Sequence, residues 1–293
     1  LASPPLVVAY AIAGSLNELA IELTAVAPGK VAIIAGDEIS QHDAYKEVVQ
    51  LAELLAAPVF GSSWPAHIPY PTSHYLWRGN LSTRAVEIAQ AMSGFDCVFA
   101  LGGKSFITIL YTEASALPDG CELFQLSVDG RDLGRTFPSK LSVVGDIELS
   151  LKALNGIIAK RIAPRDGDYR AARDVAREAF TTRKNALERR AGELATQPGL
   201  HPMVAAKILS ETIGATPIVD EAIATASHLR AFLHNGSTRQ YSFCAAARSA
   251  GACRRRWAFP WGSAVSRWCR WSATARRCIR RRRCGPPPMK TCP

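Results

Sequence analysis

Short apolar runs that end in glycine or aspartate turns are the feature that most restricts the fold of this 293-residue chain. The clearest run is Val31–Ala35, which is rich in β-branched residues and is followed directly by Gly36-Asp37-Glu38. A continuous apolar run of this length predicts a strand that is buried on both faces, as in a parallel sheet. Four more runs predict further strands: Pro58–Phe60, Asp96–Leu101, Glu122–Val128 and Leu141–Val144.

Amphipathic helices are predicted between and around these strands. The strongest is Asp43–Ala57, whose buried side is formed by Val48, Val49, Leu51, Leu54 and Leu55. Ser82–Met92 and Ile147–Ala159 follow two of the other strands, and Ser15–Ala27 precedes the first one with Ser15 and Glu18 in capping-box spacing. Strands that alternate with helices through short right-handed connections form a doubly wound sheet, so we predict an α/β fold with a Rossmann-like central domain.

The beginning of a second α/β domain is predicted beyond a highly charged helical stretch, Arg161–Gly199. Its elements are a helix at His201–Ile213, a strand at Thr216–Val219, a helix at Glu221–Leu233 and a strand that starts at Tyr241–Cys244. We therefore divide the chain into a lead and first helix (1–27), a central domain (28–160), a charged helical linker (161–199), the start of a second domain (200–247) and a tail (248–293).

The tail differs in composition from the rest of the chain. The whole chain has a net charge of +10, but Arg248–Pro293 alone carries twelve Arg, one Lys and no Asp or Glu, so the other residues sum to 10 − 13 = −3. The net charge of the chain therefore does not indicate a surface on the folded part that binds nucleic acid or an acidic membrane.

The cysteines and the ends of the sequence indicate the compartment. Five of the eight Cys lie in the tail, and the three outside it make no disulfide framework, so we expect a reducing cytoplasm. No signal peptide or membrane-length apolar run is apparent, and the start at Leu1 without Met suggests a fragment.

Two local motifs resemble parts of ligand-binding sites, but both have simpler structural interpretations. Gly103-Lys104-Ser105 follows a strand, but a phosphate-binding loop needs a glycine at position 98, where Val98 stands inside the strand. No G-x-G-x-x-G fingerprint follows any predicted strand, which disfavours a nicotinamide cofactor. His67 and His74 share one loop with Trp64 and Tyr70. These histidines either line a pocket or pack on the edge of the sheet, and we favour the second interpretation.

The order and spacing of these elements resemble the central domain of thiamine-diphosphate-dependent enzymes of the benzoylformate decarboxylase and acetolactate synthase group. The resemblance covers Pro28–Ala159 and rests on the runs VAIIAGDE from Val31, LAELLAAPV from Leu51, PTSH from Pro71, Asp96 to Gly102, Val128-Asp129 and Val144-Gly145-Asp146. His201-Pro202, IVDEA from Ile218 and Tyr241-Ser242-Phe243 are similar to the opening of that family's diphosphate-binding domain.

After Tyr241-Ser242-Phe243 the family would continue with a glycine-rich turn, a buried helix and a strand that ends in a G-D-G-S motif. The resemblance implies that the glycines approach the cofactor diphosphate and that the Asp binds Mg²⁺. None of these residues is present here. The departure suggests a frame-shift near Ala245–Arg248.

The genetic code supports the frame-shift hypothesis. If the last base of each codon is read with the first two of the next, the code forces Gly at Trp257-Ala258 and Trp261-Gly262, Val at Trp268-Cys269, and Glu at Met289-Lys290. Codons can also be chosen so that Ser266–Arg276 reads PVVSVVGDGS, in the order that the family requires. A genuine Arg-rich arm would instead interleave Lys and polar residues. We expect the tail to be disordered and the strand near Tyr241–Cys244 to be left exposed.

The resemblance implies a thiamine-diphosphate- and Mg²⁺-dependent lyase that acts on a 2-oxo acid, with a homodimeric or homotetrameric parent. Ile223 and Ala224 match positions that approach the cofactor in the family. We expect this chain to be inactive, to bind neither thiamine diphosphate nor Mg²⁺, and to contain no catalytic or metal-ligating residue. The alternatives are a fragment of an acetolactate-synthase-like carboligase, a module that binds flavin adenine dinucleotide (FAD), and a basic-tailed nucleic-acid-binding protein.

Overall fold

The computed structural model describes residues 16–109, 112–213, 216, 218–222, 225–233, 241–243 and 269–271. A helix over residues 16–25 precedes the first strand. The strands of the first sheet are β1 (Val31–Ala35), β2 (Val59–Gly61), β3 (Trp77–Asn80), β4 (Cys97–Leu101), β5 (Glu122–Ser127) and β6 (Leu141–Val144). The helices are α2 (Glu38–Gln41), α3 (Tyr45–Leu55), α4 (Ala85–Met92), α5 (Ile147–Ile162), α6 (Asp166–Ala195), α7 (Pro202–Ile213) and α8 (Ala226–Phe232), with 3₁₀ turns at Gly130–Asp132 and Ala163–Arg165.

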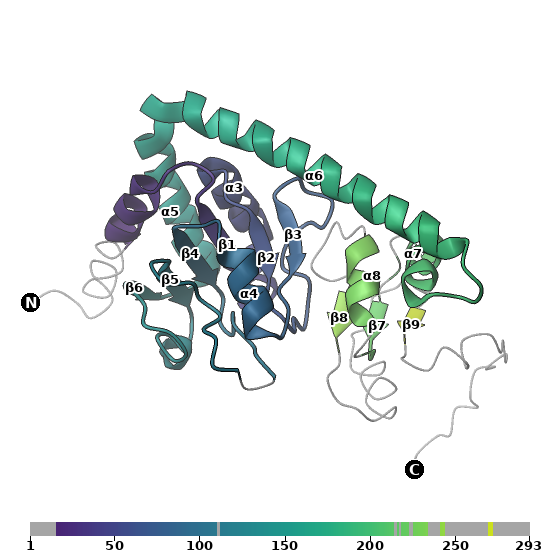
Figure 1. Cartoon of the computed structure of the whole chain (residues 1–293). Helices are drawn as coiled ribbons and strands as arrows, with labels where there is room; N and C mark the ends of the chain where they lie inside the picture. The colour runs from purple at the N-terminus through teal and green to yellow at the C-terminus, as the bar shows by residue number, and fades with distance from the viewer. Residues whose placement is uncertain are drawn as a thin grey trace, which may run out of the picture.

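The first sheet has six parallel strands in the order β3-β2-β1-β4-β5-β6. This order reverses between β1 and β4, which is the switch point of a doubly wound sheet. The predicted α/β fold with a Rossmann-like central sheet is therefore confirmed (Figure 1). None of the described helices is both long enough and apolar enough to cross a membrane.

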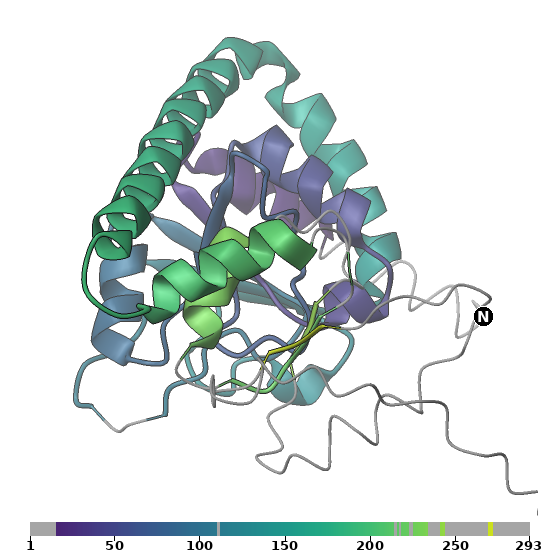
Figure 2. The ribbon, with the colours of Figure 1, turned by 90° about the vertical axis from the view of Figure 1, so that its right-hand side faces the viewer.

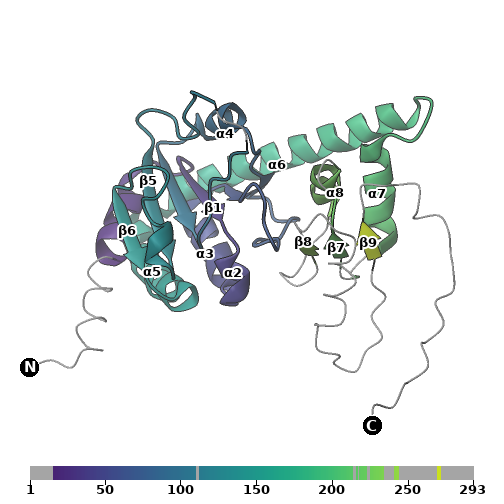
Figure 3. The same cartoon turned by 90° about the horizontal axis from the view of Figure 1, so that it is seen from below.

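Successive residues of the central strands point into two separate cores, as the period-two geometry of a strand requires. In β1, Ile33 and Ala35 join one core, whereas Ala32 and Ile34 join the other. The first core is covered by α3, α5 and the helix over 16–25, and the second is covered by α4 and the segment over 112–121. Figure 3 shows α4 on one face of the sheet and α2, α3 and α5 on the other.

The ends of the helices follow local chemistry, and they correct several predicted boundaries. Asp146 caps α5 by accepting a hydrogen bond from the Leu149 amide at 2.9 Å, as expected for an Asp at this position. The helix predicted from Ser82 begins only at Ala85, because the Ser82 hydroxyl accepts the Arg84 amide and holds residues 82–84 in a turn. Ala56 ends α3 in a left-handed conformation with φ 50°.

Helix α6 joins the two sheets. It is 30 residues long. Figures 1 and 2 show that it runs from α5, at the edge of the central domain, to α7. Arg173 donates to the Glu53 carbonyl of α3 at 3.1 Å, and the Arg177 guanidinium lies 4.4 Å from the centre of the Tyr75 ring. At the other end, Ala191 and Leu194 are buried. The linker predicted at 161–199 is thus one long helix after a 3₁₀ turn.

The second sheet contains β7 (Ile218–Asp220), flanked by β8 (Tyr241–Phe243) and β9 (Cys269–Trp271), all parallel. Strand β8 is an edge strand among the described residues, but the Tyr241 side chain is fully buried, so the expectation of an exposed strand is wrong at this residue. Strand β9 corrects the expectation of a disordered tail for three of its residues, because Cys269–Trp271 pairs with β7. The rest of residues 248–293 lies outside the described part, as does the proposed frame-shift junction.

Candidate functional site

The switch point between β1 and β4 is the first place where an open α/β sheet could bind a ligand. The two strands meet there through glycines, since the Gly36 amide donates to the Leu101 carbonyl at 2.7 Å and Gly102 has φ 78°. The Glu38 side chain fills the space beyond them and is only 8% exposed. Its carboxylate accepts the Ser127 hydroxyl at 2.9 Å and the Val128 amide at 3.1 Å. A buried acidic group therefore occupies the position where a dinucleotide pyrophosphate would lie.

Gly103-Lys104-Ser105 is not a phosphate-binding loop. Residues 104–109 form no helix after β4, so the stretch lacks the helix N-terminus on which such a loop depends. The Ser105 hydroxyl instead donates to the Gly103 carbonyl at 2.8 Å. The interpretation made from Val98 is confirmed.

Asp37 fixes the loop that follows β2. Its carboxylate accepts the amides of Ala66 at 2.7 Å and His67 at 3.2 Å. Burial raises the pKa of Asp37, and the two amide hydrogen bonds oppose this shift. The loop in turn reaches the second sheet, because His67 Nδ1 donates to the Tyr241 carbonyl at 3.1 Å. His67 is therefore a structural link between the two sheets.

His74 belongs to a packed aromatic cluster. Its Nδ1 accepts the Tyr70 hydroxyl at 3.0 Å and the Leu76 amide at 3.2 Å, so Nε2 carries the proton and donates to Glu53 at 3.2 Å. Burial lowers the pKa of His74. The fully buried Tyr70 ring stacks on Trp77 with 6.0 Å between ring centres. The packing interpretation of this histidine is thus confirmed.

The carboxyl edge of the second sheet carries a buried acid. The Asp220 side chain is fully buried and accepts the Tyr241 hydroxyl at 2.5 Å and the Ala222 amide at 2.8 Å. Burial raises the pKa of Asp220, while these hydrogen bonds and the charge of Arg230 oppose the shift. Burial also raises the pKa of Tyr241 well above its usual range. Asp220 therefore holds the turn after β7 against β8.

The residues predicted to approach the cofactor come directly after this turn. Ile223 and Ala224 lie outside the described residues, so their role stays a prediction. The residues of the G-D-G-S motif in the shifted reading also lie outside the described part. Within the described residues, no three His, Cys, Asp or Glu side chains are grouped as they would be around a metal ion. The sequence itself contains no Asp or Glu after Glu221. Beyond Glu221, the side chains therefore do not fit a Mg²⁺ ion, which prefers carboxylate ligands.

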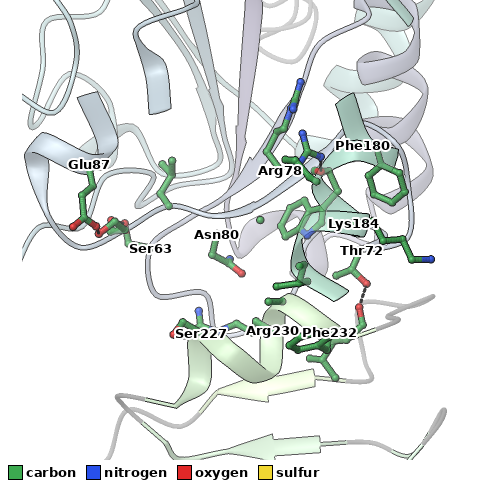
Figure 4. Close-up of a pocket in the computed structure, with 18 of the residues that line it drawn as sticks. Ser63, Thr72, Arg78, Asn80, Glu87, Phe180, Lys184, Ser227, Arg230 and Phe232 are labelled. Atoms are coloured by element: carbon green, nitrogen blue, oxygen red, sulfur yellow. Dashed lines mark hydrogen bonds between the residues drawn. The ribbon is translucent and has the colours of Figure 1, made fainter. Parts of the chain in front are cut away.

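A cavity of about 1000 Å³ lies between the two sheets (Figure 4). One wall comes from the loop after β2 and from β3, the second from α6, and the third from α8. Four aromatic side chains and four cationic side chains line it: Trp64, Trp77, Phe180, Phe232, Arg78, Arg183, Lys184 and Arg230.

No sequence pattern predicts this cavity. The apolar runs of the sequence predict no strand at β3, and the helix that contributes Phe180 is predicted only as part of a charged linker. One signal was present in that helix. Phe180 and Leu187 lie seven residues apart and share one face of α6, which is apolar spacing within a charged stretch.

Comparison with known proteins agrees with this architecture. Residues 22–154 match the family described as "Thiamine pyrophosphate enzyme, central domain". Benzoylformate decarboxylase from Pseudomonas aeruginosa is 30% identical over 122 residues, which are 42% of this chain and 23% of that protein. Sulfoacetaldehyde acetyltransferase from Alcaligenes xylosoxydans xylosoxydans is 28% identical over 175 residues, which are 59% of this chain and 28% of that protein.

Solved structures extend the likeness beyond residues 22–154. Benzoylformate decarboxylase from Polynucleobacter necessarius superposes with a TM-score of 0.63 at 19% identity, over 80% of this chain and 40% of that one. The 4-hydroxybenzoylformate decarboxylase from Rhodococcus jostii RHA1 gives a TM-score of 0.59 at 19% identity, over 78% and 40%. At this identity the likeness concerns the fold. The matched region spans about a quarter of the curated relatives and two fifths of the solved ones.

Proposed function

Because residues 22–154 of this chain are the central domain of a thiamine pyrophosphate enzyme, we propose that it derives from a 2-oxo acid decarboxylase of the benzoylformate decarboxylase type. The observation that carries the proposal is the continuity of the likeness beyond the central domain. The match to the benzoylformate decarboxylase structure covers 80% of the chain, more than residues 22–154 alone could supply. In such an enzyme the bound cofactor supplies an electron sink for the carbanion left when CO₂ departs.

The residues of this chain would position the cofactor-binding edge rather than take part in the chemical step. Asp220 and Tyr241 fix the turn that precedes Ile223 and Ala224, the predicted cofactor contacts. His67 and Asp37 hold this edge against the central domain. A buried hydrogen-bonded network of this kind keeps a binding edge in one conformation.

We further propose that the chain, with its present sequence after β8, binds neither Mg²⁺ nor thiamine diphosphate. All 25 acidic residues lie at or before Glu221, so no side-chain carboxylate follows Glu221 to hold the metal. Adding thiamine diphosphate, Mg²⁺ and benzoylformate or pyruvate should release no CO₂. Measurable turnover by the purified chain would refute the proposed inactivity.

A second version of the chain tests the frame-shift separately. A gene with one base added, or two bases removed, near the Ala245–Arg248 codons would encode G-D-G-S where the family has its metal motif. In calorimetry, the restored chain should take up Mg²⁺ and thiamine diphosphate together, whereas the original chain should give no heat of binding. Equal behaviour of the two chains, or independent gene reads that keep the Arg codons in frame, would reject the frame-shift.

A relative named as an acetyltransferase also matches the chain, so an activity other than simple decarboxylation is the alternative. A decarboxylase and a carboligase differ in their products, which are a free aldehyde for the first and a compound with a new carbon–carbon bond for the second. Product analysis on the frame-restored full-length enzyme separates them. Release of the free aldehyde as the main product favours the decarboxylase.

We propose no nucleotide or nucleic-acid function. An FAD pyrophosphate at the switch point would face the buried Glu38 carboxylate, which disfavours it electrostatically. A yellow purified protein would contradict this. The excess of basic residues lies in residues 248–293, which we do not assign to nucleic-acid binding. Salt-dependent DNA binding by the whole chain would contradict this conclusion.

A further inference from the structure

The cavity between the two sheets has an unbalanced positive charge. Only two carboxylates line it, Glu87 and Glu188, and each is bound elsewhere. Glu87 accepts the Ser82 hydroxyl at 2.6 Å and the Arg84 guanidinium at 3.0 Å. Glu188 forms an ion pair with Lys207 of α7. Neither carboxylate pairs with a cation of the cavity wall.

Three of the four cations of the wall have no carboxylate partner among the described residues. Among the described residues, no Asp or Glu forms an ion pair with Arg78, Arg183 or Lys184. Arg183 donates from Nη2 to the Trp77 carbonyl at 2.8 Å, while its Nη1 is buried and has no hydrogen-bond partner in the described part. Desolvation lowers the pKa of Arg78, which is the direction expected for a cation without a counter-charge.

The remainder of the chain has no acidic side chain with which to neutralise these cations. All 25 Asp and Glu residues of the sequence fall within the described ranges. The segments outside those ranges therefore contribute no side-chain carboxylate, wherever they lie. A buried guanidinium nitrogen without a partner is costly, so Nη1 of Arg183 is a donor that an acceptor entering the cavity would satisfy.

We infer that this cavity is a binding site for a small organic anion in which a carboxylate or phosphate is attached to an aromatic ring. The guanidinium groups of Arg78 and Arg183 suit a planar or tetrahedral oxyanion, which accepts two parallel hydrogen bonds from such a fork. Trp64, Trp77 and Phe180 offer faces and edges for the ring. The volume of about 1000 Å³ is at the upper end of the range for ligand sites, so a single-ring anion fits easily. This site is separate from the carboxyl edge where the cofactor contacts are proposed.

Calorimetry with phenyl phosphate tests the inference on the full chain, with inorganic phosphate and phenol as half-probes. Phenyl phosphate should bind with a Kd below about 1 mM, and each half-probe should bind about tenfold more weakly. Arg78→Gln and Lys184→Gln should each weaken the binding of phenyl phosphate about fivefold. Arg183→Lys should weaken it about tenfold, because lysine keeps the charge but lacks the forked donor groups of the guanidinium. Arg189→Gln, an exposed site on the same helix outside the cavity, is the matched control and should bind like the parent chain.

Arg78 and Lys184 donate no hydrogen bond to another described residue, so their variants should keep the parent circular dichroism and urea midpoint. Folded variants that bind phenyl phosphate as tightly as the parent would overturn the inference. So would absence of saturable heat from the parent chain up to about 10 mM ligand. Self-association that is lost in Arg78→Gln but not in Arg189→Gln, without any phenyl phosphate binding, would instead assign these cations to a partner chain.

Discussion

Replacing Gly36 with alanine is expected to lower the free energy of unfolding by about 3 kcal/mol, the upper end of the usual cost of overpacking. A Cβ atom at this position would lie 2.3 Å from the Gly102 carbonyl oxygen and 3.0 Å from that of Leu101. Both contacts are with backbone, so no side-chain rotation can relieve them. The Gly36 amide also donates to Leu101 at 2.7 Å, and relief of the clash would lengthen this bond between the two central strands.

Gly94→Ala is the matched control, because a Cβ there meets nothing within 4 Å. It should change the free energy of unfolding by less than about 0.5 kcal/mol. Urea unfolding followed by circular dichroism measures both variants, and an unchanged denaturant slope would show that the cost is in the folded state. Similar stability of the two variants would mean that β1 and β4 do not approach as closely at the switch point as the structure has them.

Replacing Asp220 with alanine is expected to destabilise the second sheet by about 2–3 kcal/mol, because the substitution leaves buried donors without an acceptor. The donors are the Tyr241 hydroxyl and the Ala222 amide. Hydrogen exchange measured by mass spectrometry on the β7 and β8 peptides should rise, while the β1 and β4 peptides should stay as protected as before. Uniform loss of protection in both sheets, or none in either, would contradict a local role for Asp220.

Asp220→Asn separates the charge from the hydrogen bonds. Burial raises the folded-state pKa of Asp220, so the folded state holds this proton more tightly than the unfolded state. Stability from this group is therefore full below its unfolded pKa and falls as the pH rises from about 4 to the raised folded value, above which it is constant. The Asn variant should lack this slope and should lose less stability than Asp220→Ala.

Asp174→Ala controls for the removal of a carboxylate. Asp174 is exposed and pairs only with Arg177 on the same helix at 2.7 Å. Exposed pairs of this kind contribute little, so the variant should stay within about 0.5 kcal/mol of the parent and should keep the parent pH dependence. A pH slope in Asp220→Asn equal to that of Asp174→Ala would assign the titration to another group.

The class of fold and most of the central sheet follow from local patterns in the sequence. The runs that became β1, β4, β5 and β6 are apolar and end in glycine or aspartate, so burial on both faces and the following turn could be inferred locally. The amphipathic pattern of α3 and the Asp146 cap of α5 are equally local. The resemblance to thiamine-diphosphate enzymes depended on the same local runs in their order.

Three features required the tertiary structure: strand β3, the contacts that link the two sheets, and the cavity between the two sheets. Trp77–Asn80 contains an arginine and a glycine, and it becomes a strand because β2 offers its backbone groups for pairing. The charge imbalance of the cavity depends on where Glu87 and Glu188 find their partners, which no local pattern records. Local propensity and apolar periodicity depend on neighbouring residues, whereas a cavity depends on side chains from distant segments whose partners are chosen only when the chain has folded.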